Sequence, residues 1–267
     1  MTEPAEPAAV PTRRGRLGRR RLRPVSVLGV LGELLITAGV GVLLFIAWQL
    51  WWNDMIVAGE QSKAAADIST NWIAEDRKAR DADAPPPAPA EYGDPVISRV
   101  PATADPFAVL FVPRFGAEYH RTVAEGVGTS VLNSTRLGIG HYPDTQMPGE
   151  VGNFAVAAHR SAYGGGMHLI NELQLGDAIY VQTADGYFTY RFRDLEYVAP
   201  TGVDVLEPVP GSPGAVPKDR IITLTSCNPL YSTDERIIAY GVFESWQPTS
   251  AGPPAEIAPI IAAQAKG

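Results

Sequence analysis

Residues 27 to 48 form an uninterrupted apolar run, VLGVLGELLITAGVGVLLFIAW, in which Glu33 is the only ionisable side chain. Helical residues at about 1.5 Å each give this run a length of about 33 Å, close to the bilayer hydrocarbon thickness of about 30 Å. The run therefore predicts one transmembrane helix, placed with its flanks at residues 25–52. A cleaved signal peptide is the alternative, but its apolar region is normally only about 7 to 15 residues long.

The residues on either side of the apolar run predict its orientation. The first 23 residues contain seven Arg and two Glu, although the whole chain carries a net charge of −7. A basic tail is typical of proteins that bind nucleic acid or an anionic membrane surface, and beside an apolar span the lipid bilayer is the indicated partner. Arg stays on the cytoplasmic side, whereas Trp48, Trp51 and Trp52 favour the opposite interface. We expect a cytoplasmic tail at residues 1–24, no binding of nucleic acid, and an extracellular remainder.

The composition changes again after the predicted span. Residues 53–83 mix Ala, charged and sparse apolar residues and indicate a partly helical stalk. Residues 84–90, APPPAPA, indicate an extended polyproline spacer, with a proline-recognition ligand as the alternative. We expect a stalk and linker at 53–94, a folded domain at 95–247, and a mostly flexible tail at 248–267 in which IAPIIAAQA is a candidate short helix.

The folded domain has the pattern of a mainly β protein. β-Branched and aromatic residues fill short runs that turn residues separate, and Asp185-Gly186 between two of the runs is a hairpin signal. Only residues 167–174, MHLINELQ, have a helical pattern, closed by Gly176. Eight strands at short spacing with one or two helical turns predict a closed or nearly closed β-barrel. The predicted strands are 96–100, 107–115, 119–127, 154–159, 178–183, 187–199, 220–227 and 236–246.

The chain contains one cysteine, Cys227, at the end of an apolar run. An exported protein with a single cysteine forms no intramolecular disulfide, and an unpaired external thiol is open to oxidation unless it has a function. The alternative is a small buried hydrophobe. Because Asn228 and Pro229 follow directly, the strand is expected to stop there and place the thiol at the rim of the sheet, where catalytic groups are common.

Two further residues also lie at strand ends. Arg236 opens the next predicted strand nine residues after Cys227, so a hairpin connection would make the two neighbours. A permanent positive charge there lowers a thiol pKa or stabilises an oxyanion; a surface arginine paired with Asp234 or Glu235 is the alternative. His159 ends the run AVAAH before a Gly-rich loop and can serve as base and then as acid in an acyl transfer.

The remaining histidines offer rivals for the base. His120, His141, His159 and His168 show no zinc-type spacing with the single cysteine, so neither a metal site nor another cofactor is expected. His168 lies beyond the Gly-rich loop and is the main rival for the base. His141, in the sequence GHYP, is a candidate for the lining of the cleft.

These segments resemble the sortase family. TLTSC (223–227) resembles the sortase nucleophile motif TLxTC, AAHRSAYGGG (157–166) resembles the histidine segment, and GHYPDTQMPGEVGNFAVAAHR (140–160) resembles the stretch that leads into it. The match covers about residues 95–246. The N-terminal anchor, the HR-x-x-YG pattern and the short interval from Cys227 to Arg236 are most similar to class E sortases. Ser226 departs from the usual Thr.

The resemblance implies an eight-stranded sortase β-barrel with a cysteine transpeptidase activity in a Gram-positive bacterium. Cys227 would attack the Thr carbonyl of a C-terminal sorting signal and form a thioacyl enzyme, His159 would protonate the leaving amine, and Arg236 would hold the oxyanion or the substrate backbone. An amine of a peptidoglycan precursor would then resolve the thioester, anchoring the secreted substrate protein to the cell wall. The class E resemblance implies an LAxTG-like rather than an LPxTG-like signal. Candidate substrate contacts are Leu224, Thr225, Ser226, Tyr163, His168 and Tyr231.

Three alternatives remain. A pilus-polymerising sortase commonly carries a second membrane helix near its C-terminus, and residues 248–267 contain no such run. An L,D-transpeptidase also uses an extracytoplasmic cysteine, but its S-x-G-C-x-R pattern is absent around Cys227. A non-catalytic membrane-tethered barrel that binds a wall partner predicts an unreactive thiol.

Overall fold

The computed structural model describes residues 26–48, 52–80, 88 and 92–264. The chain divides into two compact units, Met1–Ile46 and Ala47–Gly267. The predicted Arg-rich tail and most of the polyproline spacer lie outside the described residues. In the first unit, α1 (Val27–Ala47) is an apolar helix with no buried side chain, long enough to cross a membrane by length and composition. An N-terminal membrane anchor is consistent with this helix, although a signal sequence has the same properties.

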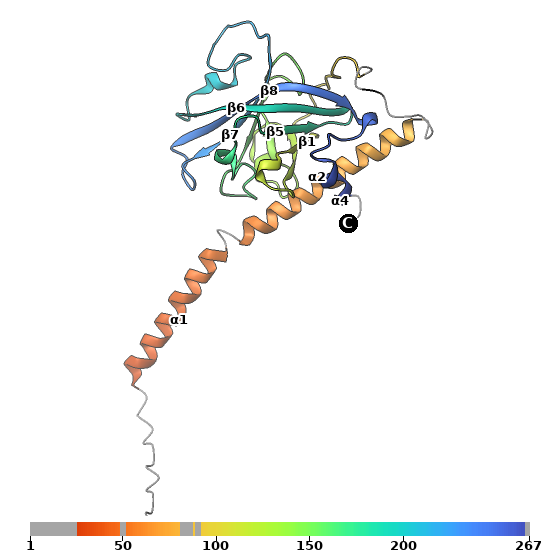
Figure 1. Cartoon of the computed structure of the whole chain (residues 1–267). Coiled ribbons are helices and arrows are strands. Elements are labelled where there is room, and N and C mark those ends of the chain that lie inside the picture. Colours follow the sequence, from red (N-terminus) through yellow and green to blue (C-terminus); the bar gives the residue numbers. More distant parts are fainter. Residues whose placement is uncertain (1–25, 49–51, 81–87, 89–91, 265–267) are drawn as a thin grey trace, which may run out of the picture. The chain divides into compact units, whose positions relative to one another are not determined.

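The second unit is built on a closed β-barrel of eight strands, which confirms the predicted fold class (Figure 1). Around the barrel the strand order is β1-β2-β3-β4-β7-β8-β6-β5. Pairing is antiparallel except for β2 with β3 and β4 with β7, which are parallel. The strands are β1 (Pro106–Phe111), β2 (His120–Glu125), β3 (Gly138–His141), β4 (Gly152–Ala158), β5 (Ala178–Gln182), β6 (Gly186–Val198), β7 (Arg220–Asn228) and β8 (Glu235–Pro248).

Alternation along the strands separates the barrel core from its outer face. Ile222 and Leu224 of β7 and Val156 of β4 are fully buried in one core cluster with aromatic residues such as Phe154. Residues at the intervening positions, Thr225 among them, therefore point outward. The apolar face of the parallel β4–β7 pair thus fixes which side chains of β7 line the outside of the barrel.

Two predicted elements are wrong, and one strand was missed. Residues 96–100 form no strand, because Pro95 and Pro101 flank them and proline cannot donate to a ladder. Residues 167–174 form turns and a three-residue 3-10 helix, η4 (Ile170–Glu172), instead of an α-helix. In place of the predicted strand 96–100, the barrel contains β3. Its sequence includes two glycines and therefore resembles a turn. Gly140 is required there because a Cβ would lie 2.3 Å from the Gly126 carbonyl oxygen.

Helices outside the barrel pack against it and against each other. α2 (Asn53–Ala79) lies along the barrel next to β2 and β1, and α4 (Ala258–Gln264) lies beside α2 (Figure 1). α2 buries Ala65 together with barrel residues such as Val109 and Phe111, and Ile257 and Ile261 at the C-terminal end belong to the same cluster. The segment expected to be a partly helical stalk is therefore a long helix packed on the barrel. A further single-turn helix, α3 (Thr129–Leu132), precedes β3.

Candidate active site

Cys227 lies at the end of β7, one residue before the strand stops. Its thiol is free and its side chain is partly exposed. Because Leu224 points into the core, strand alternation directs Thr225 and Cys227 to the outer face. The thiol is therefore accessible at the rim of the sheet, and it is not sealed within the barrel.

Arg236 is the direct partner of Cys227 in the β7–β8 ladder. Opposite residues of an antiparallel pair place their side chains on the same face, with Cβ atoms about 4.5 to 5.5 Å apart. The guanidinium Nη1 atom donates to the carbonyl oxygens of Thr233 (3.0 Å) and Glu235 (2.9 Å). Arg236 is thus held by backbone carbonyls of the β7–β8 loop, and its Nε and Nη2 atoms have no hydrogen-bond partner among the described residues.

His159 follows the last residue of β4, on the other side of β7. The last registered pair of the parallel β4–β7 ladder joins Ala157 to Thr225, so His159 and Cys227 each lie two residues further along the same face. His159 thus follows β4, which is one neighbour of β7, and Arg236 lies on β8, which is the other. The structure brings the three predicted residues to one edge of the barrel.

The imidazole of His159 contacts Asn133 and Tyr163. Its Nε2 atom is 2.9 Å from the Oδ1 atom of Asn133, and its ring centroid is 5.1 Å from that of Tyr163 at an interplanar angle of 34°. Burial lowers the pKa of His159 below its ordinary value, and the negative charge of Asp54 on α2 partly opposes this shift. Because an amide oxygen only accepts, Nε2 carries a proton and Nδ1 remains the nitrogen able to exchange one.

Arg160, the residue after His159, ties the histidine segment to the cysteine segment. It is buried, its Nη1 atom donates to the Asn228 side-chain oxygen and lies 3.5 Å from the Cys227 carbonyl oxygen, and its Nη2 atom donates to Asn171 at 3.0 Å. Hydrogen bonds from a buried cation are stronger than neutral ones. Arg160 therefore fixes the backbone at the thiol against the loop that follows β4.

His168 and Tyr231 lie at a small cavity of about 200 Å³ beside this edge, together with Ser161 and the first turn of α2. The Nδ1 atom of His168 is 3.0 Å from the Arg160 carbonyl oxygen. Tyr163 and Tyr231 both have positive φ, at 49° and 67°, and both side chains are exposed. Of the three predicted substrate contacts, His168 and Tyr231 therefore line this cavity, and Tyr163 packs on the His159 ring.

The residues before Cys227 divide between the two faces of β7. Leu224 was expected to contact substrate, but its side chain is fully buried in the core because it lies at an inward position. Thr225 is outward, and its hydroxyl is 3.1 Å from that of Tyr142. Ser226 is buried, and its hydroxyl donates to the Ala158 carbonyl oxygen at 2.8 Å. Of the three, only Thr225 has a side chain on the face of the thiol.

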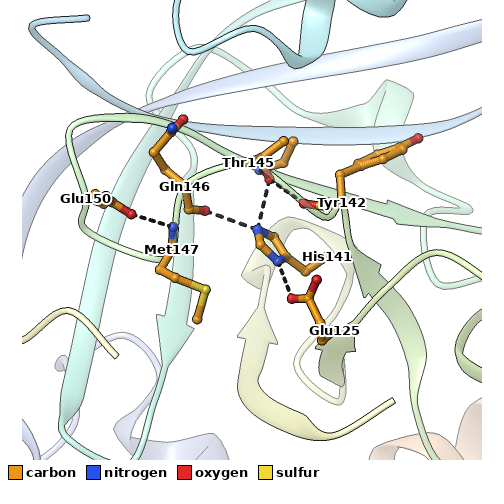
Figure 2. A network of polar contacts seen from close by, with 8 residues as sticks. Glu125, His141, Tyr142, Thr145, Gln146, Met147 and Glu150 are labelled. Carbon is orange, nitrogen blue, oxygen red and sulfur yellow. Dashed lines mark hydrogen bonds and ion pairs between the residues drawn. The ribbon is translucent and has the colours of Figure 1, made fainter. Parts of the chain in front are cut away.

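His141 was a candidate for lining the cleft, and the structure places it elsewhere. Figure 2 shows its ring between the Glu125 carboxylate, 2.7 Å from Nδ1, and the Thr145 hydroxyl, 2.9 Å from Nε2. The His141 side chain is completely buried. It has this position because every residue of β3 is buried, and it supports the loop that carries Tyr142 instead of facing solvent.

A thiol, an imidazole and a guanidinium on one accessible rim can support nucleophilic acyl transfer. The imidazole can exchange a proton with the sulfur and with a leaving or attacking amine, and a fixed positive charge can stabilise an oxyanion. Sequence reasoning missed Asn133 and Arg160. Asn133 precedes β3 in an unremarkable polar loop, whereas the position of Arg160 next to His159 was a usable signal.

Comparison with known proteins gives the family. The sortase domain model matches residues 110–244. The sequence is 32% identical over 251 residues to Sortase SrtE1 of Streptomyces coelicolor, covering 92% of this chain but 65% of that protein, so this chain spans just under two thirds of its length. It is 31% identical over 234 residues to Sortase SrtE2 of the same organism, covering 84% of this chain and 86% of that protein.

Solved structures share the barrel. SrtA sortase from Actinomyces oris is 36% identical with a TM-score of 0.57, over 61% of this chain and 93% of that one. Sortase E1 from Streptomyces coelicolor, solved with a tripeptide in its active site, is 36% identical with a TM-score of 0.53, over 58% of this chain and 99% of that one. The chain belongs to the sortase family, a family of cysteine transpeptidases, and is most similar to its class E members.

Proposed function

We propose that this chain is a membrane-anchored sortase that cleaves a C-terminal sorting signal between Thr and Gly and transfers the protein to an amine of the cell wall. The observation that carries the proposal is the arrangement around β7: Cys227 is paired with Arg236 on one side and followed in register by His159 on the other. Family membership supplies the reaction class, and the accessible free thiol supplies the nucleophile.

In the first half-reaction, the thiolate of Cys227 attacks the carbonyl carbon of the signal Thr. The carbonyl oxygen becomes an oxyanion, for which Arg236 offers its Nε and Nη2 hydrogens. The carbon–nitrogen bond to Gly then breaks, and the imidazolium of His159 gives its proton to the leaving amine. The product is a thioester between Cys227 and the substrate protein.

In the second half-reaction, a neutral primary amine of a peptidoglycan precursor attacks the thioester. His159 takes the proton that the amine loses, the carbon–sulfur bond breaks, and an amide forms as the thiolate leaves. The same imidazole thus serves as acid in one half and as base in the other. No cofactor is needed for either step.

Two features support the location and the substrate. The apolar helix α1 suits a single-pass anchor. The seven Arg residues that precede it in the sequence favour an N-terminus in the cytoplasm and a barrel outside the cell. A tripeptide in the active site of Sortase E1 from Streptomyces coelicolor supports a peptide substrate for this chain as well. Class E similarity favours an LAxTG-like signal on secreted proteins over an LPxTG-like one.

The test uses the full chain in detergent micelles with two fluorescence-quenched peptides, one carrying LAxTG and one carrying LPxTG. We expect cleavage of the LAxTG peptide, a peptide adduct on Cys227 detectable by intact-protein mass spectrometry, and transfer of the acyl group to added primary amines. Cys227→Ala and His159→Ala should each lower turnover by about a thousandfold or more, because residues that act as one unit are each indispensable. Full turnover in either variant would remove that residue from the mechanism.

The acceptor amine distinguishes a wall-anchoring enzyme from a polymerising one. Transfer to short peptidoglycan-stem amines fits the proposal, whereas exclusive transfer to a lysine side chain within a folded pilin domain would indicate a pilus-polymerising sortase. A wild-type chain that cleaves neither peptide and forms no adduct would indicate a binding barrel instead.

A further inference from the structure

Helix α2 is joined to two loops beside the barrel by a buried polar side chain in its first half. Gln61, Ala65 and Ser69 are four residues apart and so lie on one face of the helix, and all three are fully buried. Alanine and serine bring the helix backbone close to the barrel, and the Ser69 hydroxyl donates to the Gln182 side-chain oxygen at 2.7 Å. Gln61 has a longer side chain than Ala65 or Ser69, and it contacts two loops outside the strands.

The amide nitrogen of Gln61 uses both of its hydrogens. It donates to the Ser134 carbonyl oxygen at 2.8 Å and to the Tyr163 carbonyl oxygen at 2.9 Å. Ser134 precedes β3 and Tyr163 follows β4, so one side chain on α2 joins two loops that lie far from it in the sequence. These two bonds hold their acceptors in a defined geometry, whereas the Gln61 Oε1 atom is buried without a hydrogen-bond partner among the described residues.

The loops leave space for this amide through two glycines. A Cβ at Gly138 would lie 2.6 Å from the Gln61 Nε2 atom, and one at Gly164 would lie 2.7 Å from its Oε1 atom. Both glycines have positive φ, at 91° and 86°, so each supplies a backbone conformation as well as the missing side chain. The position of Gln61 is therefore defined from both sides.

Two residues in contact with the imidazole of His159 belong to these loops. Asn133, which accepts from the histidine at 2.9 Å, immediately precedes Ser134. Tyr163, whose ring packs against the imidazole, is itself the second residue bound by Gln61. Gln61 acts on the histidine indirectly. It fixes the backbone of Tyr163 and that of Ser134, the residue next to Asn133.

We propose that Gln61 is a positioning residue for His159, which makes α2 a part of the catalytic unit and not only a connector. This proposal rests on the proposed function in one respect: it takes His159 to be the acid and base. The bond of Asn133 to Nε2 leaves Nδ1 for proton exchange, so movement of the Asn133 loop would release the imidazole from this orientation. A small displacement of a catalytic group lowers the rate of the chemical step far more than it lowers binding.

The test compares two variants of the full chain that each remove a hydrogen bond between α2 and the rest of the unit. Gln61→Met keeps approximately the side-chain volume and loses both donors. Ser69→Ala loses the bond to Gln182 and leaves both loops untouched. We expect kcat for peptide cleavage to fall about 10- to 100-fold in Gln61→Met, with KM changed less than about twofold, and to stay within about twofold in Ser69→Ala.

A second readout needs no turnover. Cys227 is the only cysteine of the chain, so its rate of alkylation by iodoacetamide, followed from pH 4 to pH 10, reports the thiol together with the imidazole beside it. We expect the His159-dependent inflection, identified by its loss in His159→Ala, to move to higher pH in Gln61→Met, because water enters the loosened loops. Ser69→Ala should keep the wild-type inflection.

The outcomes separate this inference from the proposed function. A wild-type chain that fails to cleave either peptide contradicts the function, and the alkylation profile still decides the positioning. An unchanged inflection in Gln61→Met, or kcat losses in the two variants that merely follow their thermal destabilisation, would overturn the inference. If Gln61→Met does not fold, Gln61→Asn keeps the amide but is one methylene too short to reach both carbonyls, and the same criteria apply to it.

Discussion

Ser226 donates its hydroxyl hydrogen to the carbonyl oxygen of Ala158 at 2.8 Å, so the residue before the thiol is bonded to the residue before the imidazole. The bond crosses the parallel β4–β7 pair where its registered ladder ends. It therefore ties the two strands together at the position where the candidate catalytic side chains emerge. Ser226 is also the position at which the sequence departs from the usual threonine of the family motif.

We expect Ser226→Thr to retain activity within about threefold, because threonine keeps the hydroxyl, and Ser226→Ala to be less active and less stable by about 1 kcal/mol, the usual net value of one hydrogen bond. Peptide cleavage and urea unfolding, followed by tryptophan fluorescence, measure the two effects. Equal activity of the alanine and threonine variants would show that the hydroxyl has no part in aligning the strands.

Arg236→Lys tests whether donor geometry or charge matters at the third residue of the candidate catalytic set. Lysine keeps the positive charge but has no planar fork, and it cannot bond two loop carbonyls and an oxyanion in the same way. We expect kcat to fall at least about tenfold, as for the loss of an oxyanion donor. Arg193→Lys, at an exposed position of β6, is the matched control and should change nothing. A nearly unchanged rate in Arg236→Lys would mean that long-range charge is sufficient.

The pH dependence follows from the direction of the His159 pKa. Burial lowers this pKa, and Asp54 opposes the shift, so Asp54→Asn should lower the pKa further and move the inflection of Cys227 alkylation to more acidic pH. An alkaline shift would show that Asp54 acts on the histidine by some means other than its charge.

The same shift predicts a change of stability with pH. A histidine whose pKa is lower in the folded chain binds more protons when the chain is unfolded. Its contribution to stability is therefore complete above the unfolded pKa of about 6.5 and is lost as the pH falls through the folded pKa. The unfolding free energy should therefore decrease from pH 7.5 to pH 5, and this decrease should be smaller in His159→Gln. Equal pH dependence in both chains would contradict the assignment.

Arg160→Met removes the buried cation that binds Asn228, Asn171 and the cysteine carbonyl. Hydrogen bonds to charged groups are each worth about 1.5 to 3 kcal/mol, so loss of the two shorter bonds should cost about 3 to 6 kcal/mol in urea unfolding and most of the turnover. Arg99→Met, at an exposed position before β1 and without a hydrogen bond or ion pair to the other described residues, serves as the control. A variant that keeps its stability would show that the Arg160 contacts are replaced by water.

The strands were predictable where buried and outward-facing side chains alternate along the sequence. Runs such as 220–227 and 236–246 carry β-branched residues at inward positions, and the structure confirms them as β7 and β8. β3 was not predictable in this way, because backbone contacts at its glycines replace side-chain packing. The run at 96–100 shows the converse: it has the composition of a strand but is enclosed by prolines.

The candidate site was predictable at its strand ends but not in its supporting loops. Cys227, His159 and Arg236 could be located because each lies where an apolar run begins or ends. Asn133 and Gln61 could not, since a polar residue in a loop or on an alanine-rich helix gives no sign of which distant carbonyl or ring it meets. The buried stripe of α2 is made of small and polar residues, so it resembled a solvated stalk.

The last of the described strands, β8, lies between β7 and β6 and completes the closed barrel. A nascent chain therefore cannot close the barrel until residues 235–248 have been synthesised and are free to pair. The thiol and the guanidinium meet through a local hairpin, whereas the histidine reaches them only through a parallel pairing of distant segments, which forms more slowly. An incompletely emerged chain would consequently carry Cys227 without Arg236 opposite it until residues 235–248 are free to pair with β7.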